Sequence, residues 1–134
     1  MVANRYSKVR AGEQASAVVE FVLVLPLVLT MALALLQVGL LAKDQLVVVE
    51  SARAGAREGS VSTNDLDVEQ TAVEAAATLD AARLEVSVER EGGAGTAITV
   101  SVTYHAPVVV PLVAWLFPSA IDLRATATMR QETG

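Results

Sequence analysis

The chain contains no cysteine and a single histidine, His105. The missing thiols exclude a disulfide and a thiolate metal site, and they give no sign of the redox compartment. His105 has no second histidine or thiol to work with, and neither a glycine-rich phosphate loop nor a Ser-His-Asp arrangement can be read from the sequence. We therefore expect a protein that is not an enzyme, with no cofactor, no metal and no small-molecule substrate.

Charge is also missing, over one long stretch. Residues 21–42 contain no charged side chain and read FVLVLPLVLTMALALLQVGLLA; we call them the apolar run. A helix needs about 20 apolar residues to cross a bilayer, so residues 16–42 are expected to form a transmembrane helix. The mean hydropathy of +0.48 and the 53% of hydrophobic residues are high for a soluble protein, and the apolar run explains much of this excess.

The charges that are present are unevenly placed. Arg5, Lys8 and Arg10 precede the apolar run, whereas residues 43–134 carry 7 basic and 13 acidic side chains. Because basic flanks stay in the cytoplasm, we expect a cytoplasmic N-terminus and an extracytoplasmic domain over residues 43–134. An acidic external domain argues against nucleic acid as a partner, and its length is enough for one small core.

The start of the apolar run carries the most specific motif in the chain. Ser16-Ala-Val-Val is followed by Glu20 and Phe21, and Pro26 comes early in the run. This start resembles that of the TadE-like minor pseudopilins of the tight-adherence (Flp, type IVb) pilus system. In that family, four small or apolar residues precede Glu-Phe or Glu-Tyr, and an early Leu-Pro follows.

The resemblance implies that a prepilin peptidase removes a basic leader, residues 1–15, by cutting between Ala15 and Ser16. The family usually has glycine before the cut, where this chain has Ala15. Cleavage would give Ser16 a free α-amine, which is protonated at neutral pH, and residues four apart lie on one side of a helix. Glu20 could then neutralise this amine or that of a neighbouring subunit. The alternative is that Glu20 marks the boundary between water and lipid.

The same resemblance implies a function and partners. The function is a minor role in Tad/Flp pilus biogenesis, adhesion or related secretion, carried out in the cytoplasmic (inner) membrane or within the pilus. The partners are the membrane, the prepilin peptidase, other pilins or pseudopilins, and the inner-membrane assembly platform. Two alternatives stay open: a permanently anchored binding module, and a soluble domain released by signal peptidase after Ala34.

Beyond the membrane, the helical pattern is expected to continue to Gly59. Ser51, Gly55 and Gly59 are spaced by four and form a strip of small residues that lets another backbone approach closely. Arg53 and Arg57 are also four apart, and such like charges are unfavourable in an isolated helix. They indicate an acidic partner, with a solvated face as the alternative. The stretch also resembles a segment common at this place in the TadE-like family.

The remaining pattern predicts an α+β domain. Asn64 or Asp65 can cap a short second helix, whose helical spacing reaches Asp80. Apolar residues then occupy every second position over residues 84–88, 98–104 and 121–129. Such alternation predicts strands, and the glycines of residues 92–95 predict a turn that makes the first two strands a hairpin. We expect a three-stranded antiparallel sheet covered by the extramembrane helices.

An uncharged segment, residues 107–118, separates the last two predicted strands. It is too short to span a bilayer. Its aromatic residues, Trp115 and Phe117, suit a membrane interface or a partner contact. The alternative is that the segment folds back to fill the small core.

Overall fold

The computed structural model describes residues 3–132, with side chains described from Glu13 onward except Gln14. The predicted basic side chains Arg5, Lys8 and Arg10 lie outside the described side chains. The elements follow in the order α1 (Ala3–Val61), α2 (Asp65–Ala75), the 3-10 helix η1 (Ala81–Arg83), β1 (Leu84–Arg90), β2 (Ala97–Pro107), the 3-10 helix η2 (Pro111–Leu116) and β3 (Ala120–Arg130). This is the α+β arrangement that the sequence predicts, with a long apolar helix, a short second helix and three strands.

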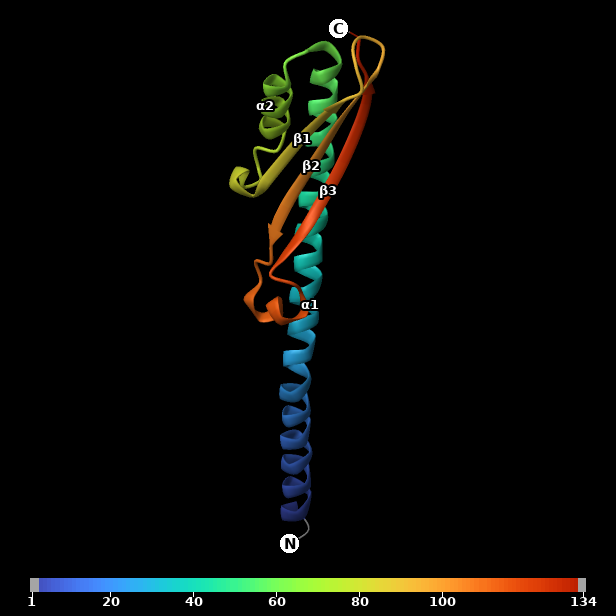
Figure 1. The fold of residues 1–134 in the computed structure, drawn as a ribbon. Helices are drawn as coiled ribbons and strands as arrows, with labels where there is room; N and C mark the ends of the chain where they lie inside the picture. The colour runs from blue at the N-terminus through green and yellow to red at the C-terminus, as the bar shows by residue number, and fades with distance from the viewer. Residues whose placement is uncertain (1–2, 133–134) are drawn as a thin grey trace.

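Helix α1 serves both as the apolar segment and as the support of the domain (Figure 1). At 1.5 Å per residue it extends for about 88 Å. Its N-terminal half projects away from the domain, whereas its C-terminal half packs along the sheet. The helix continues through Pro26, and the carbonyl of Pro26 accepts a hydrogen bond of 2.7 Å from the Thr30 hydroxyl. That bond satisfies a polar group inside the apolar run.

The sheet is antiparallel throughout, with the order β1-β2-β3. Val102 is paired with Val86 on one side and with Ala125 on the other, so the alternating apolar residues of all three strands face the same way. Helix α1 covers β2 and β3, and α2 contacts β1. The predicted hairpin is confirmed. Its turn includes Gly95 at φ +87°, a left-handed conformation that glycine adopts without steric cost.

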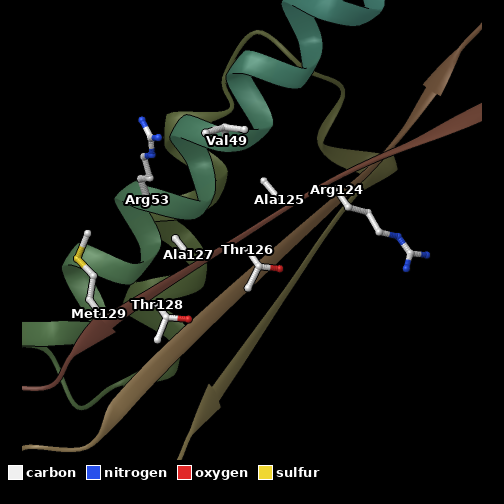
Figure 2. A pocket seen from close by; sticks show the side chains of 8 residues that line it. All are labelled: Val49, Arg53, Arg124, Ala125, Thr126, Ala127, Thr128 and Met129. Carbon is white, nitrogen blue, oxygen red and sulfur yellow. The ribbon is translucent and has the colours of Figure 1, made fainter.

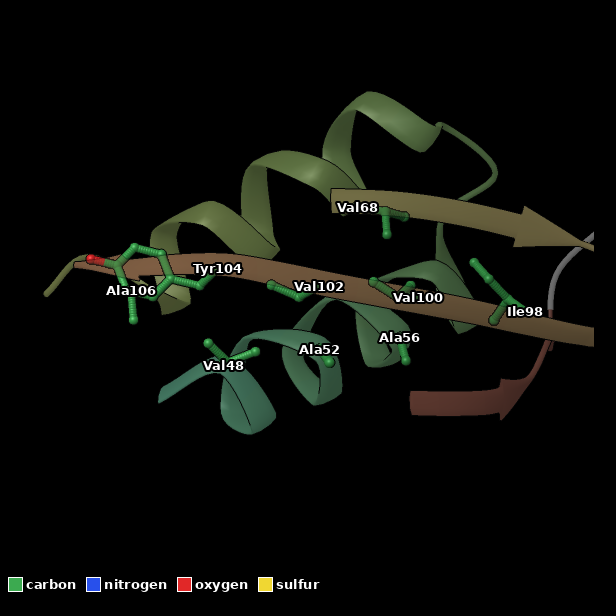
Figure 3. Packing of buried hydrophobic residues seen from close by; sticks show 9 residues of the cluster. All are labelled: Val48, Ala52, Ala56, Val68, Ile98, Val100, Val102, Tyr104 and Ala106. Carbon is green, nitrogen blue, oxygen red and sulfur yellow. The ribbon is translucent and has the colours of Figure 1, made fainter. Parts of the chain in front are cut away.

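The hydrophobic core lies between α1, α2 and the central strand β2 (Figure 3). Its buried members are Val48, Ala52, Ala56, Val68, Ile98, Val100, Val102, Tyr104 and Ala106. Every second residue of β2 is fully or almost fully buried, because this strand has a neighbour on each side and helices over one face. The alanines of α1 are small enough to bring the helix close to the sheet.

Helix α2 is shorter than its sequence pattern predicts. Its start is as expected, because the Asn64 side chain accepts a hydrogen bond from the Leu66 backbone amide at 3.2 Å. The helix ends at Ala75 rather than at Asp80. The Asp80 carboxylate instead accepts a bond from the Ala82 amide and so caps η1, which turns the chain into β1.

Candidate membrane and assembly site

From Ala15 to Leu29, α1 is apolar on all sides except at Ser16 and Glu20, and little packs against it. Every side chain from Ala15 to Leu29 is exposed, and Thr30, the next residue, is half-buried. The most apolar window of the helix has a mean hydropathy of 2.6, and none of that window is buried. A helix that is hydrophobic all round needs an apolar environment, and α1 is long and apolar enough to cross a membrane.

The predicted processing and assembly residues all lie on this exposed part of α1. The bond between Ala15 and Ser16 lies within the helix, and both side chains are exposed. Ser16 and Glu20 are four positions apart and therefore lie on one side of the helix, about one turn from each other. Phe21 is 64% exposed. No described side chain forms an ion pair with Glu20, so its carboxylate remains open to a partner from outside the described chain.

Gln37 is the residue of the apolar run that the sequence reasoning missed. Its side chain is only 1% exposed, and its Oε1 accepts hydrogen bonds from the backbone amides of Val109 (3.1 Å) and Val110 (3.2 Å). A buried amide group is costly unless it is hydrogen-bonded. The signal in the sequence was therefore the presence of a glutamine deep in an apolar helix, which requires a partner from elsewhere in the chain.

Two further polar side chains of α1 hold the domain. Gln45, which follows Gln37 by eight positions, donates from Nε2 to the Arg124 carbonyl of the edge strand β3 at 2.9 Å. The buried Ser51 hydroxyl donates to the Ala72 carbonyl of α2 at 2.7 Å. Together with the bonds of Gln37, these contacts fix the domain to α1 over about four helical turns rather than at one point.

The strip of small residues is used inside the chain. Ser51, Gly55 and Gly59 are all buried. A Cβ atom on Gly55 would lie 3.1 Å from the side chains of Ala72 and Val100, and one on Gly59 would clash with Ile98. The close approach that the spacing predicts is therefore made by the chain's own α2 and β2, and these three residues do not face a partner in this structure.

Arg53 and Arg57, by contrast, are exposed on α1. Arg53 pairs with Glu50 at 3.4 Å, and both side chains are mostly exposed. Arg53 lines a hollow of about 460 Å³ between α1 and the edge strand β3. Figure 2 shows Arg53 on α1 together with the lining residues of β3. Both arginines also line an adjoining hollow of about 400 Å³, next to Met129. Two cations beside a strand edge remain available to a partner of opposite charge.

Arg90 joins the ends of three elements, which the sequence did not reveal. Its Nε lies 2.6 Å from the Asp65 carboxylate at the start of α2. The other two guanidinium nitrogens donate to the carbonyls of Gly59 (3.3 Å) and Ser62 (3.0 Å). The last carbonyls of a helix have no partner within it, so Arg90 completes the C-terminal end of α1 and anchors the turn into α2.

The single histidine lies on the solvent-facing side of the sheet, between two carboxylates. Nδ1 of His105 is 2.6 Å from Asp122 on β3, and Nε2 is 3.3 Å from Glu85 on β1. Hydrogen bonding to Asp122, and then to Glu85, raises the pKa of His105 above its usual 6.5. Within the part of the chain that the structure describes, no cluster of His, Asp and Glu side chains is arranged to hold a metal ion.

The uncharged segment, residues 107–118, is partly buried in the domain and partly exposed, so each of the two alternatives from the sequence fits part of it. Val113 is fully buried, so part of the segment does fold back. Trp115, however, is 76% exposed, and Phe117 is half-buried. The segment lies at the end of the domain that faces the projecting half of α1 (Figure 1).

These features define a class of protein: a single-pass membrane protein whose one long apolar helix continues into a small α+β domain. The family model described as TadE-like protein matches residues 15–57, so the resemblance is confirmed from the predicted cleavage site to Arg57. The match indicates a protein associated with the Tad pilus. It covers most of α1, including Arg53 and Gly55, and leaves out α2 and the sheet. No curated protein and no solved structure matches the chain.

Proposed function

We propose that this chain is a minor pseudopilin of a Tad/Flp pilus assembly machine, which helps to initiate or regulate pilus biogenesis, adhesion or related secretion. The observation that carries the proposal is Glu20, an exposed carboxylate one helical turn after Ser16 at the start of an uncovered apolar helix. The family match, which begins at Ala15, supports it.

The mechanism follows from the cost of an unpaired charge in lipid. A carboxylate held deep in the bilayer costs about 2.5–3.5 kcal/mol. Cleavage by a membrane prepilin peptidase between Ala15 and Ser16 creates an α-amine, and Glu20 of one subunit pairs with the amine of another. The exposed apolar surface that follows Glu20 then packs against the helices of neighbouring pilins or pseudopilins. The chain is the substrate of the peptidase and carries out no catalysis itself.

The proposed site of action is the cytoplasmic membrane, with the N-terminus in the cytoplasm and the domain outside. There Arg53 and Arg57 are the best candidates for contact with an acidic partner in the assembly machine. They are exposed beside the edge strand β3, whereas the neighbouring small residues are already buried.

Two observations favour a second candidate function, a permanently anchored binding module. Ala15 stands where glycine usually precedes the cut, and Trp115 offers an exposed aromatic side chain on the domain. Such a module would keep its leader and would not need a carboxylate at position 20.

The first test identifies the mature N-terminal residue. The protein is taken from the membranes of its own host and analysed by intact mass or N-terminal sequencing. The proposal expects the chain to begin at Ser16. A chain that retains Met1 would favour the anchored module, and one that begins at Leu35 would identify a released domain.

The second test compares two identical substitutions in one helix. Glu20→Gln removes the charge that the assembly mechanism needs, so pilus assembly is expected to fail. Glu13→Gln removes a carboxylate from the predicted leader, and assembly is expected to continue. Normal piliation with Glu20→Gln, at normal protein levels, would contradict the proposed mechanism.

A further inference from the structure

The segment between β2 and β3 is the most apolar exposed part of the domain. No charged residue occurs between His105 and Asp122. Within it, Val109, Leu112 and Trp115 are 62%, 63% and 76% exposed. Exposed apolar residues gathered in one place mark a contact surface on a soluble domain, and the position of this segment indicates what covers it.

The segment is held against the apolar run of α1. Gln37 binds the amides at its start, and Val113 is fully buried. An apolar hollow of about 470 Å³ lies between α1 and η2, where Pro26, Thr30 and Ala34 face Trp115 and Leu116. Trp115 therefore lies beside the part of α1 that is apolar enough to cross a membrane, and not beyond its end.

Several polar groups of the segment form hydrogen bonds within the chain. Beyond the two amides that bind Gln37, the Val113 amide donates to the Val110 carbonyl at 3.2 Å. The indole N–H of Trp115 donates to the Leu112 carbonyl at 3.1 Å. Irregular backbone is tolerated at membrane depth only where its polar groups find partners in the protein. These bonds meet that condition for the groups they join.

We propose that residues 107–118 form an interfacial segment that enters the extracytoplasmic leaflet beside α1, with lipid acyl chains filling the hollow lined by Trp115. The bilayer is the occupant because the exposed apolar surface of the segment is continuous with that of the membrane-spanning helix. The inference depends on α1 crossing the membrane and does not depend on the proposed role in pilus assembly.

The interfacial segment also changes where the membrane lies along α1. Tryptophan favours the boundary between lipid and water, and the hollow that contains Trp115 reaches Ala34. Counting about 20 residues back for a bilayer, the span runs from near Ala15 to near Ala34 and ends earlier than the predicted transmembrane helix, residues 16–42. Glu20 then lies inside the hydrocarbon and not at its edge.

The chain offers a direct test, because Trp115 is its only tryptophan. The full chain is placed in phosphatidylcholine nanodiscs, which leave both membrane faces open to solutes. Quenching of Trp115 fluorescence is then measured with brominated phosphatidylcholines and with aqueous acrylamide. The matched control carries Trp115→Phe together with Thr63→Trp, which moves the indole to an exposed position in the loop between α1 and α2.

We expect brominated lipid to quench Trp115 at least twofold and acrylamide to quench it weakly, with the reverse for the control. Quenching of Trp115 by acrylamide as strong as in the control would place the segment in water and overturn the proposal. Shielding from both quenchers would show that protein covers the segment, which also overturns it. Neither result would affect the proposed pilus role, since the nanodiscs contain no assembly machinery.

A second readout uses the absence of native cysteine. Leu112→Cys changes an exposed side chain, so the fold is expected to persist. In nanodiscs it should react with a hydrophilic maleimide at least tenfold more slowly than Thr63→Cys. Equal rates for the two variants would contradict insertion of the segment into lipid.

Discussion

The two halves of α1 are comparably helical, but their surroundings differ completely. Between Ala15 and Leu29 no side chain is buried, and apolar residues point in every direction. From Gln37 onward burial recurs at helical spacing through Val48, Ala52 and Ala56. The surface of the first half is suited to lipid, whereas the second half is covered by the chain's own sheet and α2.

The difference shows how one helix can satisfy two solvents. The half that faces lipid only has to be apolar and long enough, so its apolar residues are not confined to one face of the helix. The half that supports the domain needs small residues where elements approach closely and polar residues where backbone groups must be satisfied. Gln37 belongs to the second half by its contacts, although it lies within the apolar run. The change of surroundings along α1 therefore precedes the first charged residue after the run, Lys43.

The largest expected effect is a difference in domain stability between the same valine-to-alanine substitution made in each half of α1. Val48→Ala removes two buried methyl groups and leaves a cavity, so the domain should lose about 2–3 kcal/mol of unfolding free energy. Val22→Ala makes the same change where valine is 57% exposed, and the domain stability should stay constant. Urea unfolding in detergent micelles, followed by circular dichroism, measures both. Equal losses of unfolding free energy in the two variants would contradict the described difference between the halves.

The next effect concerns the end of α1. Arg90→Met leaves the Gly59 and Ser62 carbonyls without their guanidinium partner, and the expected loss is about 2 kcal/mol. Arg83→Met is the matched control, because Arg83 forms only an exposed pair with Asp80. Such pairs contribute about 0–1 kcal/mol. The same unfolding measurement applies. If Arg83→Met lost as much unfolding free energy as Arg90→Met, the role of Arg90 at the end of α1 would be contradicted.

A smaller and more local effect is expected at the boundary between the two halves. Gln37→Leu leaves the amides of Val109 and Val110 without an acceptor, at a cost of about 1–2 kcal/mol. Hydrogen exchange over residues 109–113 should become about tenfold faster, the factor that corresponds to about 1.4 kcal/mol. Gln70→Leu, on the exposed face of α2, should leave that exchange unchanged. Unchanged exchange in Gln37→Leu would contradict the anchoring.

The smallest effect concerns pH and the solvent-facing side of the sheet. Asp122 and Glu85 face His105, and Arg124 lies 3.8 Å from Asp122. Because these carboxylates raise the pKa of His105 in the folded state, its contribution to stability is complete below about pH 6.5. The contribution is lost as the pH rises through the raised pKa. In the His105→Gln variant, the free energy of unfolding should change less over this pH range than in the native chain. Parallel pH profiles for the two proteins would contradict the stabilising role of His105.

Much of this fold could be predicted from local patterns. Alternation at period two located all three strands, and Asn64 marked the start of α2. The end of α2 was misplaced because Asp80 fits the helical spacing but caps η1 instead.

The contacts of Gln37, Arg90 and His105 could not be predicted in the same way. Each joins residues far apart in the sequence, such as Gln37 and Val109, and no spacing rule reaches so far. For Glu20 and the predicted cleavage site the reverse holds. The motif is local and can be read from the sequence, but the partner proposed for Glu20 lies outside the described chain.

The absence of any linker between the membrane segment and the domain has a mechanical consequence. The domain is fixed to α1 at Gln37, Gln45 and Ser51, and these attachments are spread over about four helical turns. A domain held at several points cannot swivel on its helix. Any force that moves α1 along the membrane normal lifts the domain by the same distance, and any torque on the helix turns the sheet with it.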